Sequence, residues 1–128
     1  MSRSSLAEKL RIKPGSRAAL FDAPKGFAAL LDPLPDGAAV SASPRGDCDV
    51  VLGFAETVAG VTSLVPRLTA ALADGGVLWI CYPKLTSAQA GELSRDVLWG
   101  ELSRFGLRPV AMIALDDTWS AMRVVPET

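Results

Sequence analysis

Two short apolar runs on either side of one amphipathic stretch dominate the middle of the chain. The runs are 50–54 (VVLGF) and 77–81 (VLWIC), and nearly continuous apolar runs of this length are typical of strands buried on both faces. Between them, four apolar residues share one face of a helix: Leu64, Val65, Leu68 and Leu72. The pattern predicts a strand–helix–strand crossover, and therefore a parallel sheet covered by helices.

Residues that favour helix ends place the limits of the central helix. Thr62 or Ser63 can cap its start, which would put Pro66 in the first turn, where a missing N–H costs little. Gly75 suits the left-handed position that follows a helix. We therefore expect the helix to begin near residue 62.

The flanking segments predict a sheet with further helices. A hairpin is expected at the C-terminus, because only three residues separate its two strands. The expected helices are 4–12, a short one with Phe27, Leu30 and Leu31 inward, and about 94–105 with Leu98, Leu102 and Phe105 inward. The other expected strands are 17–22, 38–42, 107–115 and 119–125.

Length and charge narrow the classes of function. The 128 residues suit one domain, and 13 basic against 14 acidic side chains give a net charge of -1 without a long run of either sign. We expect no binding to nucleic acid or membrane, and a cytoplasmic location. Because 49% of the residues are hydrophobic, we also expect a homo-oligomer, with the final hairpin and Trp119 at its interface.

The scarcity of histidine and cysteine excludes several kinds of site. The chain has no histidine, so a Ser-His-Asp or Cys-His nucleophile cannot form, and no metal site is expected. Cys48 and Cys81 would lie roughly 16 Å apart on neighbouring parallel strands. That separation is too long for a disulfide, so both are expected to be buried thiols.

Three segments of the chain are residues 48–56 (CDVVLGFAE), residues 72–80 (LADGGVLWI) and the pair Gly106-Leu107. They resemble three scaffold motifs of class I S-adenosylmethionine-dependent methyltransferases. The resemblance implies residues 1–128 as a single truncated domain. Its fold would be a Rossmann-like, methyltransferase-like open sheet, mostly parallel, with helices on both faces and a C-terminal antiparallel hairpin.

The same resemblance fails at the cofactor motifs. Where that family has a glycine-rich turn after its first strand, residues 21–27 read FDAPKGF, which keep only Asp22 and Gly26. Residues 40–43 (VSAS) supply no acid for the ribose hydroxyls. We therefore expect no cofactor.

The C-terminal half is similar to a small bacterial family of methyltransferase-like domains, a resemblance that implies a fold and no known chemistry. It rests on residues 82–87, 95–99 and 117–123. From the polar residues here we expect a network between the last helix and the hairpin, either functional or a structural brace. Its members are Arg95, Asp96, Asp117, Ser120 and Arg123, with Arg123–Asp96 or Arg95–Asp117 pairing.

Ligands of open α/β sheets lie beyond the carboxyl ends of the strands. The residues that follow those ends are Lys25, Gly26, Arg45, Glu56 and Lys84. They predict a site for a small anion, with exposed loop charges in water as the alternative. No nucleophile or acid partner for Glu56 is identifiable. Overall we expect a non-catalytic module that binds a small anion or a protein, leaning away from an enzyme. The alternative is a divergent S-adenosylmethionine-dependent methyltransferase, or another small enzyme, that completes its site by oligomerisation.

Overall fold

A mixed six-stranded sheet forms the centre of the molecule, with the order β2-β1-β3-β4-β6-β5. The computed structural model describes residues 6–31, 34–41, 48–84, 95–116 and 118–126. The strands are β1 (Arg17–Phe21), β2 (Ala39–Ser41), β3 (Cys48–Phe54), β4 (Leu72–Pro83), β5 (Leu107–Ala114) and β6 (Trp119–Pro126). The helices are α1 (Leu6–Lys9), the 3-10 helix η1 (Phe27–Leu31), α2 (Val58–Ala71) and α3 (Arg95–Ser103).

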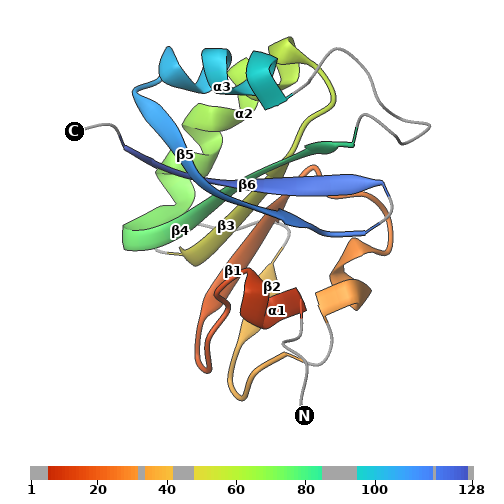
Figure 1. Ribbon diagram of the computed structural model, residues 1–128. Helices are drawn as coiled ribbons and strands as arrows, with labels where there is room; N and C mark the ends of the chain where they lie inside the picture. The colour runs from red at the N-terminus through yellow and green to blue at the C-terminus, as the bar shows by residue number, and fades with distance from the viewer. Residues whose placement is uncertain (1–5, 32–33, 42–47, 85–94, 117, 127–128) are drawn as a thin grey trace.

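The predicted crossover and hairpin are both confirmed. Strands β2, β1, β3 and β4 are parallel, and Val50 pairs with Val77 and Phe54 with Cys81 across the crossover. Strand β6 runs antiparallel to both β4 and β5. The sheet is therefore mixed, and the hairpin's second strand lies inside it while β5 forms the outer edge (Figure 1).

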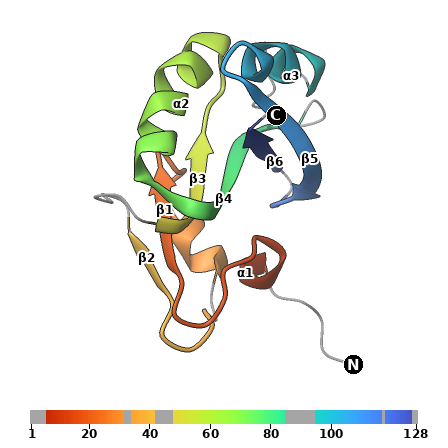
Figure 2. The same cartoon turned by 90° about the vertical axis from the view of Figure 1, so that its left-hand side faces the viewer.

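Two hydrophobic cores lie on opposite faces of the sheet, because successive side chains of a strand alternate between faces. Leucines of α2 and α3 pack with Ala19, Val51 and Met122 on one face. The residues of α1, η1 and the loop after α1 pack with Leu20, Leu52 and Trp79 on the other. Figure 2 shows α1 and α2 on opposite sides of the central strands.

Helix α2 begins earlier than predicted. Thr57, in extended backbone, accepts a hydrogen bond on its side-chain oxygen from the Gly60 N–H (2.9 Å), which makes it the N-cap. Pro66 consequently lies inside the helix. The helix ends at Ala71, so Gly75 (φ +75°) occupies an irregular start of β4 and does not cap the helix.

Some side chains predicted to point inward are exposed. Leu98 and Leu102 are buried, but α3 ends at Ser103, and Phe105 beyond it is 37% exposed. Leu30 is 46% exposed because the 3-10 turn of η1 directs only Phe27 and Leu31 inward. Helix α1 ends at Lys9, and Arg11 then takes a left-handed conformation (φ +68°) that leads to buried Ile12.

Both cysteines are buried and neither forms a disulfide, as predicted. In the part of the chain that the structure describes, no helix is long and apolar enough to cross a membrane. Within the same residues, no cluster of histidine, cysteine or carboxylate side chains could hold a metal ion.

Candidate functional site

The chain changes direction across the sheet between β1 and β3, which are neighbours. From β1 it continues outward to β2, and from β3 it continues the other way to β4. The loops that leave the carboxyl ends of β1 and β3 therefore diverge. In open α/β sheets this topological switch point is where ligands bind. We call the sheet margin formed by the carboxyl ends of β1, β3 and β4 the carboxyl edge.

The turn that follows β1 is compact and strained at one residue. Asp22 lies in the left-handed region (φ +57°), and Gly26 does so at φ +83°. The Phe27 N–H donates to the Pro24 carbonyl (3.1 Å), which closes the turn before η1. Asp22 and Gly26 are therefore the two turn positions that reverse the chain, and Gly26 takes its conformation without the steric cost that a side chain would add.

The Asp22 carboxylate is held on the α2 side of the sheet. Its Oδ2 lies 3.3 Å from the Arg67 guanidinium, and that guanidinium lies 5.2 Å from the centre of the Phe21 ring. The two charged side chains are 58% and 51% exposed, so water screens the pair and it contributes little stability.

Aromatic side chains fill the other side of the sheet beneath the carboxyl edge. Phe27 meets Phe54 edge-on with ring centres 4.8 Å apart, and Phe54 meets Trp119 in the same way at 5.2 Å. Trp119 is only 7% exposed, so little of its side chain is available to a second chain, and the expected oligomer stays a prediction. The reason is its position at the start of β6, an interior strand, where it faces η1 and not solvent.

The predicted anion-site residues lie at the same edge. Lys25 and Glu56 are exposed, and Lys84 is partly buried. The Lys84 N–H donates to the Thr118 carbonyl (2.8 Å), which ties the end of β4 to the start of β6. Arg45 lies outside the described residues. The site therefore remains a prediction, with Lys25 and Gly26 after β1, Glu56 after β3 and Lys84 after β4.

The register of β6 decides on which face of the sheet Arg123, a member of the predicted polar network, lies. Arg123 lies opposite Trp79 and shares its face of the sheet with Trp119 and Ala121, whereas α3 covers the other face. This register gives the Arg123–Asp96 pairing no support, and the pairing stays a prediction. Ser120 projects to the face opposite Arg123 for the same reason. Asp117 and the side chains of Arg95 and Asp96 lie outside the described residues.

Two polar groups were missed by the sequence interpretation. Asp116 accepts hydrogen bonds on Oδ1 from the Thr118 and Trp119 N–H groups (2.8 and 2.7 Å), which fixes the hairpin turn. Glu101 of α3 is buried at 6% exposure. In the sequence, Glu101 directly precedes the buried Leu102, and nothing in that pattern indicates that an acidic side chain is buried there.

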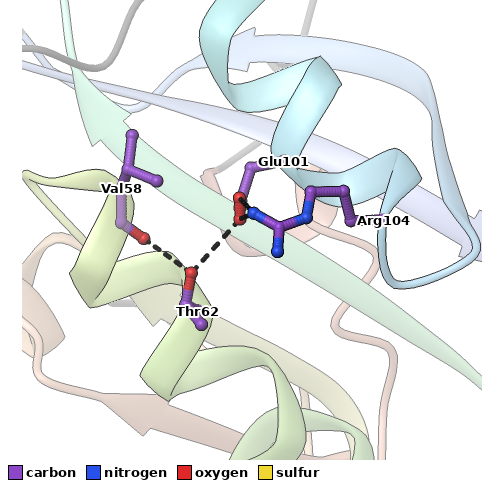
Figure 3. Close-up of polar contacts among 4 residues, drawn as sticks. All are labelled: Val58, Thr62, Glu101 and Arg104. Atoms are coloured by element: carbon purple, nitrogen blue, oxygen red, sulfur yellow. Dashed lines mark hydrogen bonds and ion pairs between the residues drawn. The ribbon is translucent and has the colours of Figure 1, made fainter.

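Glu101 braces α3 against α2 (Figure 3). Its two carboxylate oxygens accept from Arg104 (3.0 and 3.2 Å), and Oε2 also lies 3.2 Å from the Thr62 hydroxyl. The hydroxyl has one hydrogen, and the Val58 carbonyl at 3.1 Å competes for it. We interpret the group as a structural brace, since its partners are Thr62 of α2 and Arg104, the residue directly after α3.

Comparisons with known proteins identify the fold. No family model matches the chain, and no curated protein matches it. Solved structures match along almost its whole length. A methyltransferase from Geobacter sulfurreducens, solved with S-adenosyl-L-homocysteine, gives a TM-score of 0.66 at 14% identity, covering 95% of this chain and 89% of that one. A methyltransferase from Thiobacillus denitrificans, also with S-adenosyl-L-homocysteine, gives 0.61 at 14%, covering 95% and 89%.

A third match names a protein substrate. The ribosomal protein L11 methylase from Lactobacillus delbrueckii subsp. bulgaricus gives a TM-score of 0.59 at 12% identity, covering 94% of this chain and 74% of that one. Identities this low carry no residue-level roles. The matches therefore show the fold alone. The chain has a class I methyltransferase-like fold.

Proposed function

We propose that this chain is a divergent S-adenosylmethionine-dependent methyltransferase whose ligand lies at the carboxyl edge. The observation that carries the proposal is the topological switch point between β1 and β3, where ligands of such sheets bind. The structural neighbours solved with S-adenosyl-L-homocysteine support the same class of ligand.

The described residues fit that ligand only in part. Lys25 is exposed on the turn after β1, where it can pair with the methionine carboxylate, and a Cβ added at Gly26 would meet no atom within 4 Å. Pro24, however, stands where a glycine would admit the ligand closely, and Phe27 packs on Phe54 beneath the turn. We infer that a second copy of the chain completes the site, and we therefore assign no catalytic step to single residues.

Calorimetry with S-adenosylmethionine and S-adenosyl-L-homocysteine tests the proposal, run on the full chain across a range of protein concentrations. We expect binding that strengthens as the chain oligomerises, and a melting temperature that rises with ligand by mass action. Lys25→Ala should weaken binding, whereas Lys9→Ala, which removes an exposed cation of α1, should not. If neither compound binds at millimolar concentration to any oligomeric form, the proposal fails.

A second candidate is a non-catalytic module that binds a small anion or a protein. The aromatic packing of Phe27, Phe54 and Trp119 favours it, because these rings fill the α1 side beneath the carboxyl edge. The arms of the experiment separate the two candidates. Phosphate binding that depends on Lys25 and Lys84, without any binding of adenosyl compounds, would support the module.

A further inference from the structure

A cavity of about 440 Å³ opens at the opposite margin of the sheet, where the parallel strands begin. We call it the amino-edge cavity. The loop that connects α1 to β1 forms one wall, the irregular start of β4 forms another, and Arg123 of β6 lines it from the sheet. Its volume lies within the range of small-molecule sites.

Arg123 is held in this cavity by the strand it belongs to. It pairs with Trp79 across β4 and β6, and the Trp79 indole Nε1–H donates to the Leu10 carbonyl (3.0 Å), which fastens the loop after α1 against this face. The Nε atom of Arg123 is buried, and among the described residues it has no hydrogen-bond partner. A buried donor without an acceptor is unfavourable, so an acceptor supplied by a ligand would be stabilising there.

The charges of the lining select the kind of ligand. Among the described residues that line the cavity, Arg11, Lys13 and Arg123 are basic and Asp49 and Asp74 are acidic, an excess of one positive charge. Of the two carboxylates, Asp49 already accepts from the Arg17 N–H on Oδ2 (2.9 Å). A ligand with a single anionic group suits this balance, whereas the two carboxylates would repel a polyanion.

The wall formed by the start of β4 presents backbone at Gly75 and Gly76. A Cβ added at Gly76 would lie 2.7 Å from Leu72 Cδ1, 2.9 Å from the Ala73 oxygen and 3.1 Å from the Asp49 oxygen, so only glycine fits. Gly75 beside it takes a left-handed conformation (φ +75°) that side chains disfavour. The two glycines bring polar main-chain groups to the cavity where other residues would present side chains.

We propose that the amino-edge cavity binds a small organic carboxylate through the guanidinium of Arg123. Arginine holds carboxylate oxygens with two parallel N–H donors, and Nε is one of the donors used in that geometry. The exposed cations Arg11 and Lys13 attract the anion to the entrance, while Asp49 and Asp74 favour a ligand whose remaining polar groups are donors. The proposal is independent of the function of the carboxyl edge.

Titrations with sodium acetate and 4-aminobutyrate, each at matched ionic strength against sodium chloride, test the proposal. Amide resonances of Gly75 and Gly76 should shift on addition of the carboxylates, and the melting temperature should rise. The probes are very small molecules with few contacts, so dissociation constants of about 1 mM are expected.

Two variants of Arg123 and one control sharpen the test. Arg123→Met keeps an unbranched apolar stem without the guanidinium and should abolish both responses. Arg123→Lys keeps the charge without the two-donor geometry and should weaken binding about tenfold. The control Arg108→Met removes an exposed arginine of the neighbouring strand β5 and should respond like the native chain. If Arg123→Met does not fold, Arg123→Lys and the native titration still decide.

Three outcomes would overturn the proposal. They are glycine amides that stay unmoved by every carboxylate, a response of Arg123→Met equal to that of the native chain, and shifts that sodium chloride alone reproduces. A response to S-adenosyl compounds that leaves Gly75 and Gly76 unaffected would support the carboxyl edge alone.

Discussion

Two glycines, substituted identically, should change stability in opposite directions. Gly53 lies on β3 beneath α2, and a Cβ built there would approach Leu68 at 2.6 and 2.8 Å and Leu64 at 2.7 Å. Both leucines are fully buried, so neither can move aside into solvent. Gly100 lies in α3, and a Cβ there would meet no atom within 4 Å.

The expected magnitudes follow from these surroundings. Gly53→Ala should destabilise the chain by about 1–3 kcal/mol, the usual cost of an extra carbon in a tightly packed core. Gly100→Ala should stabilise it by about 0.5–1 kcal/mol, because alanine loses less conformational freedom in a helix. For a domain of this size, 1 kcal/mol corresponds to roughly 3–6 °C in melting temperature.

Urea unfolding followed by circular dichroism measures both changes, with the native chain and the double variant alongside. The double variant should equal the sum of the single changes, since the two sites share no partner. A Gly53→Ala variant as stable as the native chain would refute the close packing of α2 on β3. A destabilising Gly100→Ala would refute the helical, open environment assigned to that residue.

Two further predictions concern buried groups. Trp79→Phe should lower the free energy of unfolding by about 1–3 kcal/mol, because the Leu10 carbonyl would lose its buried donor; equal midpoints in urea would contradict this. Burial raises the pKa of the Cys81 thiol, so the native chain keeps a proton that the unfolded chain releases. The free energy of unfolding should therefore fall as pH rises past the ordinary thiol pKa of about 8.5, and Cys81→Ala should flatten this dependence in urea titrations at several pH values.

The central crossover could be predicted because its signals are local and redundant. Residues 50–54 and 77–81 are apolar on both faces, and only a strand buried on both sides has that requirement. The hairpin could be predicted equally well, since two strands joined by so short a turn can only pair antiparallel. Sequence patterns of this kind depend on neighbours in the chain and not on tertiary contacts.

The limits of helix α2 were harder to predict because several residues can cap the start of a helix. Thr57, Thr62 and Ser63 all carry a side-chain oxygen, and only the fold decides which one lies in extended backbone. Placing Pro66 in a first turn was a reasonable use of its missing N–H. The structure instead accommodates Pro66 inside a helix whose buried face, with Leu64 and Leu68, outweighs that loss.

For the site residues, the sequence predicts the edge of the sheet at which they lie but not the face to which they project. Sequence order places Lys25, Glu56 and Lys84 at one edge of the sheet, because parallel strands end together. The face of the sheet to which a side chain projects depends on its register. Arg123 was therefore assigned to the α3 side, although its pairing with Trp79 turns it toward the loop after α1.

The two margins of the sheet should act independently. Strand β3 spans seven residues from the amino edge to the carboxyl edge, which at about 3.3 Å per residue separates the two by roughly 20 Å. Effects at sites this far apart usually add within about 0.3–0.5 kcal/mol. Lys25→Ala should therefore weaken only the adenosyl response, and Arg123→Met should abolish only the carboxylate response. The double variant should show both changes together. If either single variant removed both responses, a single shared site would have to replace the two proposed here.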